Sequence, residues 1–351
     1  MKRRSDRIDL RKIVYALAGL FFFILAIQLM KAGAKTLAPL LREASLVRNP
    51  FNGLGFGWLG AYFVLSGSPV AAATLGLFNG GALDAVQSYM MINGSRMGAS
   101  FIVLFIGFIY LLRGHESRRS LSMGLLALLT TWTIYLPAML LGYAILSNGW
   151  LDGFQMSVTG QLASVVDAIF DPIVDWISMW APGLLVFVVG VGMVMFAFNL
   201  IDRALPQLSL GRVGFGEAPR LLYRPIVMFG LGMAVTSVSM SVSVSLGLLV
   251  PLSARGYIRI ENVIPYIMGA NVTTFVDTLV ASMLMNNPAA FTIVFVEMLS
   301  VALTSIAVLL VSYHSYERFV LDVAGRITRS RRNQTIFMLA LVGAPIVLLL
   351  V

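Results

Sequence analysis

Two stretches of the chain place small hydroxyl side chains and glycines inside otherwise apolar sequence. The first covers Leu65–Phe101 and opens with Ser66-Gly67-Ser68-Pro69, and the second covers Met240–Val276 and opens with Ser241-Val242-Ser243-Val244. Hydroxyl groups and free backbone amides at a helix break can hold an oxyanion or a sodium ion. Because the two stretches resemble each other, we expect them to contribute to one binding site. The expected contributors are Ser66, Gly67, Ser68, Ser241 and Ser243.

Each stretch ends in a second polar cluster, and Arg96 in the first aligns with Asn271 in the second. An arginine in the middle of a membrane segment costs at least ~2.5–3.5 kcal/mol on insertion scales, which makes it a functional residue by default. Its planar guanidinium suits phosphate, sulfate or carboxylate. We therefore expect Arg96 to bind an anion. The alternative is that Arg96 lies shallow and extends to the membrane surface.

Two carboxylates lie deep in the second half of the chain. Asp277 follows Asn271 by six residues on what we predict to be the same helix, and Thr273 and Thr274 lie between them. These four residues form the predicted ion-binding set, in which Asp277 would ligate sodium or a proton or balance the charge of Arg96. We also expect Asn271 to contact the substrate. For Glu297 we expect a structural role, although it could also bind sodium or a proton or act as a counter-ion to Arg96.

Serine occupies every second position near the start of the second stretch, between Thr236 and Ser245. On a helix this spacing spreads the hydroxyls over two faces, whereas an extended strand would put them on one side. Each serine could instead bond to a carbonyl of its own helix or permit tight helix packing. Taken as a segment, and matched by Ser66 and Ser68, the serines indicate a binding function.

The composition is that of a helical membrane protein. Hydrophobic residues make up 58% of the chain and charged residues only 12%, against about 25% charged residues in soluble domains. Apolar runs near the ~20 residues of a membrane-spanning helix recur along the chain, and barrels show short alternating segments instead. The chain has no cysteine and only two histidines, so we expect neither an enzyme nor a metal site beyond sodium.

The basic residues predict the membrane topology. Most of the 25 Lys and Arg fall in 1–12, 113–120, 202–224 and 313–334, whereas no Lys or Arg lies between Ser120 and Asp202. The positive-inside rule makes the four basic segments, including the N-terminus, cytoplasmic. This distribution assigns the net charge of +9 to membrane orientation and not to nucleic-acid binding. We expect a multi-pass protein of the plasma membrane.

Two halves of the chain repeat each other. Residues 20–39 align with 187–206 at an offset of 167, and the polar clusters align at 175. The first half begins inside and the second outside, which is the pattern of an inverted repeat. The predicted parts are a basic N-terminus (1–12), the first repeat (13–146), an acidic extracellular connection (147–181), the second repeat (182–312), a basic cytoplasmic loop (313–335) and a C-terminal transmembrane helix (336–351).

Each half also contains too much apolar sequence for one span and too many breaks for three. One re-entrant hairpin followed by one span fits best in each half, with the hairpin tips meeting near the middle of the membrane. The first apolar run has a basic start and an Ala32-Gly33-Ala34 sequence, as a signal peptide would. It is longer than usual for that role and has a counterpart in the second half, so we expect it to be a span.

Two segments resemble the type II sodium-dependent phosphate cotransporter family. They are Leu75–Gly81 with the following Asn93 cluster, and Ile267–Thr274. In that family each inverted repeat carries a Gln-Ser-Ser-Ser motif in a re-entrant hairpin and a later Gly-Ala-Asn signature. The resemblance covers about residues 13–312 and implies the fold of two inverted repeats. It also implies phosphate as substrate and sodium as coupling ion.

The chain departs from that family at the motif positions. The first motif falls on Leu65–Ser68 and the second on Met240–Ser243, and both lack the glutamine. The signature asparagine is Asn271 in the second repeat but Arg96 in the first, and Thr273 stands where the family has its second glycine. A fixed cation at Arg96 can replace a bound sodium ion electrostatically, so the resemblance implies a divergent member.

The sequence as a whole predicts a secondary transporter of a small oxyanion, phosphate first, that works by alternating access. It would use no cofactor, with sodium as the candidate coupling ion. Its partners would be the anionic solute and the lipid bilayer, and a homo-oligomer is compatible with the sequence. The alternative is a protein of the same fold that binds a phosphorylated lipid or partner without coupled transport.

Overall fold

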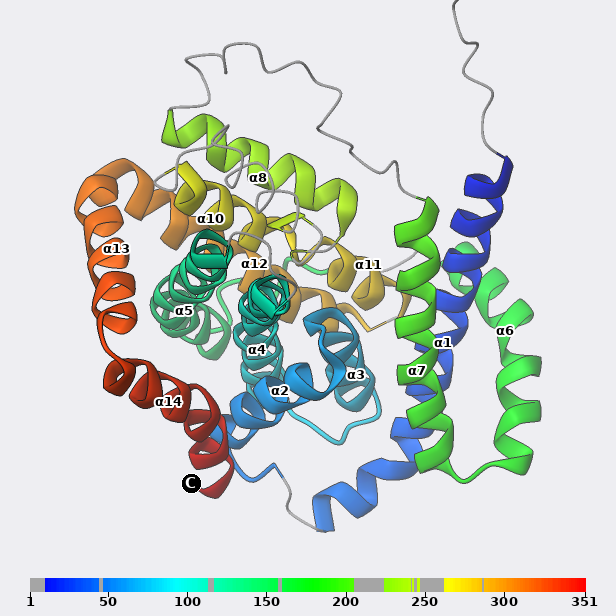
Figure 1. The fold of residues 1–351 in the computed structure, drawn as a ribbon. Helices are drawn as coiled ribbons and strands as arrows, with labels where there is room; N and C mark the ends of the chain where they lie inside the picture. Colours follow the sequence, from blue (N-terminus) through cyan, green and yellow to red (C-terminus); the bar gives the residue numbers. More distant parts are fainter. Residues whose placement is uncertain are drawn as a thin grey trace, which may run out of the picture.

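The computed structural model describes residues 10–43, 47–112, 117–156, 160–204, 224–240, 242, 245–246, 262–285 and 287–351. All regular secondary structure among these residues is helical (Figure 1). Six helical segments of this described part are long and apolar enough to cross a membrane, namely Leu10–Glu43, Ser122–Ser147, Gly183–Ala204, Val263–Leu284, Pro288–Arg329 and Arg331–Leu350. The chain is therefore an all-α, multi-pass membrane protein.

Three helices form one side of the molecule, at the right of Figure 1. They are α1 (Leu10–Glu43), α6 (Gly160–Trp180) and α7 (Gly183–Ala204). Gly33 on α1 lies against Phe187 near the start of α7, whereas Gly19 lies against Ile201 near its end. The two long helices therefore pack side by side in antiparallel directions. Glycine makes this close approach possible, because it leaves room for the facing backbone.

Two short helices and one long helix follow α1. They are α2 (Pro50–Val64), α3 (Gly67–Asn79) and α4 (Ala85–Leu112). Asn49 caps α2 by accepting a hydrogen bond from the backbone of Asn52, and Pro50 occupies the first helical position, which has no intrahelical hydrogen bond to lose. At the other end, Leu65 adopts a left-handed conformation with φ of 54° and reverses the chain. Ser66 then begins α3.

A second group repeats the geometry of α2 and α4. It consists of α8 (Pro225–Ser239) and α10 (Val263–Thr273). Helix α8 also begins with proline and ends at a left-handed residue, Met240, with φ of 49°. Both features lie 175 residues after their counterparts Pro50 and Leu65. Figure 1 shows α8 and α10 side by side above the centre of the molecule.

The helix contacts in these two pairs match at the same offset. Gly57 on α2 packs against the carbonyl of Met91 on α4, and Gly232 on α8 packs against the carbonyl of Tyr266 on α10. The reciprocal contacts, from Gly94 to Leu54 and from Gly269 to Phe229, also differ by 175 residues. The two helix pairs therefore share one packing arrangement in which backbones touch directly.

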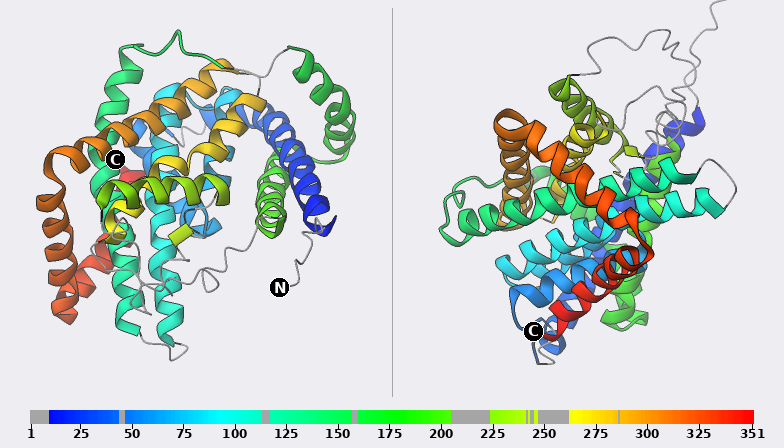
Figure 2. Two further views of the ribbon diagram at one scale, coloured as in Figure 1. Left: turned by 90° about the horizontal axis from the view of Figure 1, so that it is seen from above. Right: turned by 60° about the vertical axis from the view of Figure 1, so that its left-hand side comes forward.

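The remaining helices enclose these pairs. They are α5 (Ser117–Ser147), α11 (Val276–Leu284), α12 (Pro288–Ala307), the π-helix η4 (Val308–Ser312), α13 (Tyr313–Arg329) and α14 (Arg331–Leu350). Figure 2 shows α13 and α14 along the flank opposite α1, α6 and α7. Tyr89, Tyr135 and Phe275 are the largest fully buried side chains. They come from α4, α5 and the junction of α10 with α11, which places the core where these helices meet.

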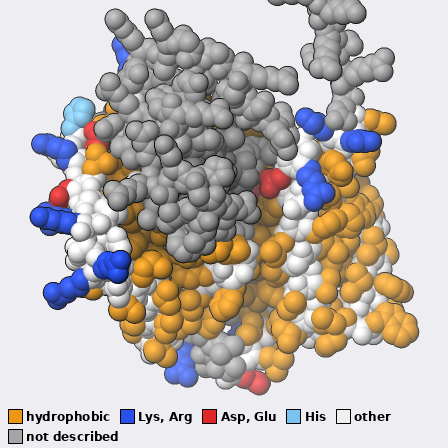
Figure 3. All heavy atoms as spheres, in the orientation of Figure 1, with side chains coloured by type: hydrophobic (Ala, Val, Ile, Leu, Met, Phe, Trp, Pro, Cys, Tyr) orange, Lys and Arg blue, Asp and Glu red, His pale blue; other side chains and the backbone are white. Residues whose placement is uncertain are grey.

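The outer surface separates apolar from basic regions. Figure 3 shows apolar side chains over α1, α6 and α7, and basic side chains along α13 and near the upper ends of α1 and α7. Exposed apolar side chains include Leu17 on α1, Val188 on α7 and Leu339 on α14. In a membrane protein such surfaces face lipid, which matches their place on the candidate spans.

The predicted acidic connection, 147–181, contains helix α6 and is not simply a loop. Its aspartates Asp167, Asp171 and Asp175 are spaced by four residues and share one face, while Phe170 and Val174 pack against α1. Gln28 of α1 donates a hydrogen bond to Asp167 at 3.3 Å. The sequence reading missed this helix because its apolar residues form a stripe and not a continuous run.

The predicted basic loop, 313–335, is likewise helical. Helix α13 occupies most of it, and α14 begins at Arg331 and not at 336. Tyr313 and Val320 are buried on one face of α13, whereas Asp322 and Arg326 form an ion pair of 2.7 Å on its exposed face. The charges lowered the apolar content of the segment without interrupting its helical periodicity.

We predict that the close helix contacts tolerate no added methyl group. Gly232→Ala should lower stability by about 1–3 kcal/mol, because the new Cβ would collide with the Tyr266 carbonyl and overpacking costs about that much. Gly230→Ala is the matched control on the same helix, since nothing lies within 4 Å of a Cβ there. Thermal unfolding in detergent measures both. Equal melting temperatures for the two variants would contradict the packing argument.

Candidate functional site

Arg96 lies in the middle of α4 and is only 4% exposed. Its Nη1 atom donates to Ser68 Oγ at 3.1 Å and to Thr274 Oγ1 at 3.4 Å. Its Nη2 atom forms an ion pair with Asp277 Oδ1 at 3.3 Å. The guanidinium thus joins the start of α3 to the junction of α10 with α11. This burial excludes the alternative in which Arg96 extends to the membrane surface.

Two further groups fix the guanidinium. Its carbon lies 5.0 Å from the centre of the Phe275 ring, a distance at which a cation is attracted to the ring face. Nη2 also donates to Thr278 Oγ1 at 2.5 Å. Thr278 in turn donates to Asp277 Oδ1 from its hydroxyl at 2.8 Å and from its backbone at 2.6 Å. One carboxylate oxygen therefore accepts three hydrogen bonds.

Each side chain of the ion pair has one polar atom that makes no hydrogen bond to a described residue. Asp277 Oδ2 and Arg96 Nε have no hydrogen-bond partner among the described residues, although both atoms are buried. An unsatisfied buried polar atom is costly. The arrangement therefore has a free donor on the cation and a free acceptor on the anion, which a ligand or water could satisfy.

The helix that we predicted to carry both Asn271 and Asp277 is broken between them. Helix α10 ends at Thr273 and α11 begins at Val276, so a two-residue turn interrupts the helix within the apolar segment Val263–Leu284. The β-branched residues Val272, Thr273 and Thr274 precede the break, and such residues propagate a helix poorly. Thr273 also donates its hydroxyl to the carbonyl of Met233 on α8 at 2.9 Å.

This bond separates Thr273 from the other predicted ion ligands. The hydroxyl of Thr273 is used between α8 and α10, whereas Thr274 faces Arg96. Asn271 faces α5, where its Nδ2 atom donates to Thr131 Oγ1 at 3.1 Å. The hydroxyl of Tyr135, also on α5, donates to the Asn271 carbonyl at 3.2 Å.

The start of α3 faces the same point. Ser66 is the N-cap residue, in an extended conformation and without a side-chain capping bond. Gly67 lies so close to the Ser95 carbonyl of α4 that a Cβ there would be crowded. The first amides of a helix lack intrahelical acceptors and carry partial positive charge. Together with Arg96 they give this region positive potential.

A small cavity lies between these elements. Its volume is about 30 Å³, which leaves room for about two water molecules. The lining residues are Ser66, Gly67, Ser68, Arg96, Ala99, Ser100, Thr131, Tyr135, Val242, Leu246, Asn271 and Thr274. The cavity between these described residues is therefore too small for a ligand larger than a few atoms.

Ser241 and Ser243, predicted as ligands, lie outside the described residues. Of the same segment, Ser245 is described and buried, and its hydroxyl contacts Thr236 at 2.7 Å and Tyr266 at 2.9 Å. Ser245 thus links α8 to α10 through side-chain hydroxyls, whereas the packing interpretation expected bonds to carbonyls of its own helix or close helix packing. Val242 and Leu246, which are described, line the cavity.

The sequence reading missed several residues at the site. Thr131 and Tyr135 line the cavity from α5, and Phe275 and Thr278 contact the guanidinium. The polar pair Thr130-Thr131 within an otherwise apolar run was the available signal for α5. No feature of the sequence indicated that Phe275 contacts the guanidinium, because this contact depends on the break between α10 and α11.

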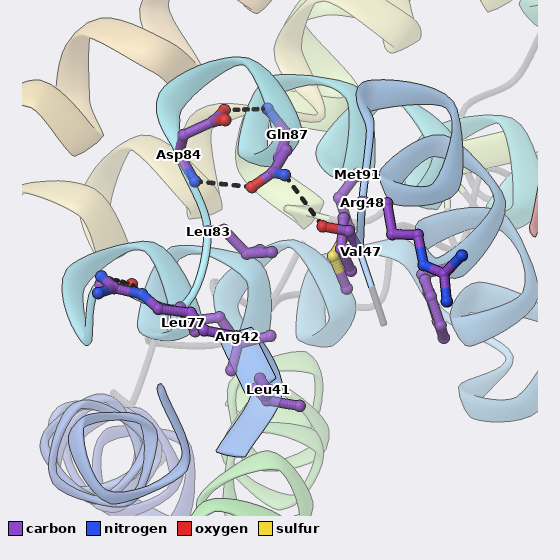
Figure 4. A pocket seen from close by; sticks show the side chains of 12 residues that line it. Leu41, Arg42, Val47, Arg48, Leu77, Leu83, Asp84, Gln87 and Met91 are labelled. Carbon is purple, nitrogen blue, oxygen red and sulfur yellow. Dashed lines mark hydrogen bonds between the residues drawn. The ribbon is translucent and has the colours of Figure 1, made fainter. Parts of the chain in front are cut away.

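A second, larger cavity lies at the far end of α3 and has about 590 Å³ (Figure 4). Its polar side chains are occupied by structural hydrogen bonds. Asp84 and Gln87 form a reciprocal capping box at the start of α4, and Gln87 also donates to the Val47 carbonyl at 3.0 Å. Arg42 donates to the Gly81 carbonyl at 2.7 Å. These bonds connect the end of α1 to the α3–α4 turn.

The described residues contain no group of three or more His, Asp or Glu side chains that could hold a metal ion. No protein-family model, curated protein or solved structure matches this chain. The chemistry of the site therefore rests on its own geometry: one buried cation, hydroxyl donors and helix-start amides around a small cavity, with a carboxylate as counter-ion.

We predict strong energetic coupling between Arg96 and Asp277. Arg96→Gln or Asp277→Asn alone should each cost about 3–5 kcal/mol, because each leaves a buried charge without its partner. The double variant should cost clearly less than the sum of the two. Unfolding of the four proteins in detergent measures the coupling free energy.

The exposed pair of Asp322 and Arg326 provides the control for this cycle. Its two side chains are 58% and 75% exposed, so Asp322→Asn should change stability by no more than about 1 kcal/mol. Strictly additive effects of the Arg96 and Asp277 substitutions would show that the buried pair does not act as a unit.

Proposed function

We propose that this chain is a secondary transporter of a small oxyanion, with inorganic phosphate as the first candidate. The observation that carries the proposal is the buried Arg96 at the small cavity, beside Ser68 and the first amides of α3. A guanidinium and hydroxyl donors that are shielded from bulk water recognise the oxygens of an oxyanion. A purely structural arginine would not need a cavity beside it.

Asp277 supports this proposal as the counter-ion of Arg96. Its carboxylate lies 3.3 Å from the guanidinium and compensates the buried positive charge. An incoming oxyanion would compete with this carboxylate for the guanidinium and use the free Nε donor. Exchange of one anionic partner for another keeps the buried cation compensated throughout, which lowers the cost of an alternating-access cycle.

The fold proposed for this transporter is a pair of inverted repeats, each with a re-entrant hairpin. The constant offset of 175 residues between the α2–α4 and α8–α10 contacts supports the repeat. The antiparallel pairing of α1 with α7 supports its inversion, because inverted copies cross the membrane in opposite directions. Helices α2 and α3, with 15 and 13 residues, are short enough for a re-entrant hairpin.

We propose that transport is only weakly coupled to sodium. Asn271, Thr274 and Asp277 offer oxygen ligands near the cavity, whereas the hydroxyl of Thr273 is bonded to α8. Arg96 supplies permanently the positive charge that a bound sodium ion would otherwise bring. We therefore expect transport to depend weakly on sodium.

Exchange of labelled phosphate in proteoliposomes tests the function. Arg96→Asn should weaken phosphate binding by about ten- to a hundredfold at low sodium, because a hydrogen bond to a charged group contributes about 1.5–3 kcal/mol, and high sodium should restore part of it. Arg326→Asn, on the exposed face of α13, is the control and should exchange normally.

Two results would contradict this prediction. Steep sodium dependence of the wild type, with unchanged binding by Arg96→Asn, would make Arg96 a structural residue. Phosphate binding without any exchange would favour a protein of this fold that recognises a phosphorylated lipid or partner.

The proposed topology places the N-terminus in the cytoplasm of a plasma-membrane protein. Because the chain has no cysteine, single substitutions report sidedness directly. Asp171→Cys on α6 and Arg329→Cys on α13 are both exposed positions, and we expect an impermeant thiol reagent to label them from opposite sides of the membrane. Labelling from the same side would refute the inverted arrangement.

A further inference from the structure

Glu297 is a fully buried carboxylate without a hydrogen-bond partner among the described residues. It lies on α12, its exposed fraction is 0%, and neither carboxylate oxygen has a hydrogen-bond partner among the described residues. Its nearest polar neighbour along the helix, Ser300, donates its hydroxyl to the Glu297 backbone carbonyl at 2.9 Å and not to the side chain. An ionised carboxylate in such surroundings costs several kcal/mol.

The titratable groups around Glu297 come from the helices packed against α12. Tyr89 and Arg96 on α4, and Tyr135 on α5, interact with it electrostatically. Helix α11 carries Asp277, which is paired with Arg96, and α10 carries Tyr266, which is bonded to Ser245. Helix α3 and η4 contain no titratable residue. Arg96 is thus the cation that acts on Glu297.

Helix α4 connects Glu297 to the proposed binding site. Tyr89, Asn93 and Arg96 lie at positions i, i+4 and i+7, and therefore on one face of the helix. Asn93 Oδ1 is also buried without a partner. Tyr135 donates to the Asn271 carbonyl and lies near enough to Glu297 for the two groups to influence each other electrostatically. The charge at Arg96 can therefore influence the protonation of Glu297 without direct contact.

We propose that Glu297 carries a proton that moves together with the oxyanion. This inference rests on the transport function proposed above and names its coupling ion. In the closed state the carboxylic acid is neutral, which removes the cost of burial. Where the site opens to water after the anion has left, the acid gives its proton to water, forming a carboxylate and a hydronium ion. The reverse reaction reloads it.

The charge balance gives the coupling its direction. Arg96 is one cation, and Asp277 already compensates it. A bound oxyanion adds negative charge, which opposes ionisation of Glu297, and a protonated Glu297 in turn favours the anion. By linkage the anion and the proton each strengthen binding of the other. The two should therefore cross the membrane in the same direction.

A proton fits this position better than sodium does. A sodium ion needs several converging oxygen ligands and space to accommodate it. Tyr89 instead directs its hydroxyl to the carbonyls of Ala138 and Met139, and Glu297 does not line the cavity beside Arg96. A proton requires only the carboxylate itself.

Phosphate uptake under an imposed pH gradient tests the inference with the full chain in proteoliposomes. The membrane potential is held at zero, and both solutions are acidic enough for phosphate to remain mainly the monoanion. With the inside one pH unit more alkaline, coupling of one proton to one anion should accumulate phosphate about tenfold. Glu297→Gln should still exchange labelled phosphate at equal pH but should show no accumulation.

The control is Glu43→Gln, an exposed glutamate at the end of α1, which should accumulate phosphate like the wild type. Wild-type exchange without pH-driven accumulation would overturn the proton inference and leave the transport function intact. Absence of both exchange and phosphate binding would overturn the transport function itself. Accumulation driven by a sodium gradient and abolished by Glu297→Gln would identify a sodium site and also overturn the inference.

A second measurement covers the case in which Glu297→Gln does not fold. A hydrophobic carbodiimide reacts with protonated carboxyl groups in apolar surroundings, and mass spectrometry locates the adduct in the wild-type protein. We expect an adduct on Glu297 that is lost as the pH rises. An adduct on Asp277 alone, or none on Glu297 under conditions of pH-driven uptake, would overturn the inference.

Discussion

The buried ion pair of Arg96 and Asp277 is the constraint on which the centre of the structure depends. A guanidinium that is 4% exposed needs compensation from several directions, because a buried unpaired charge costs far more than any single helix contact gains. Asp277 supplies the charge, Phe275 the ring face, and Ser68, Thr274 and Thr278 the hydroxyls. These groups come from α3 and from the α10–α11 junction. The positions of both elements relative to α4 are therefore set by one side chain.

The glycine contacts make that convergence sterically feasible. At Gly57 and Gly94 the backbones of α2 and α4 touch, and at Gly232 and Gly269 those of α8 and α10 do the same. Helices that approach this closely form compact pairs. The chain reversal at Leu65 brings the start of α3 beside α4, where Gly67 is crowded by the Ser95 carbonyl. Small residues thus determine the shape of the site, and the polar residues determine its charge.

The sequence predicted the apolar spans and the residues near the centre better than the connections between them. Arg96, Ser68, Thr274 and Asp277 could be singled out because polar residues are conspicuous in an apolar chain, and the structure brings them together. Helices α6 and α13 were missed because half of each is polar. The break after Thr273 was missed because β-branched residues such as Val272 and Thr273 lower helix propensity only slightly, so they do not by themselves predict where a helix ends. Thr131 and Tyr135 could not be predicted as site residues, because sequence periodicity does not show which helix lies beside α10.

The relation between the cation and the two carboxylates decides how the site can work. One guanidinium can neutralise one carboxylate, and Asp277 is in direct contact with it whereas Glu297 is not. The proposed proton coupling follows from this difference: Glu297 carries its proton while it is buried and releases it where water reaches it, because a higher dielectric lowers the cost of a charge. In that proposal, opening and closing of the site change the number of bound protons. An anion that competes with Asp277 for Arg96 changes the charge around Glu297 as well. In the proposed cycle, binding of the ligand, binding of the proton and opening of the site therefore all depend on how the charge of Arg96 is compensated.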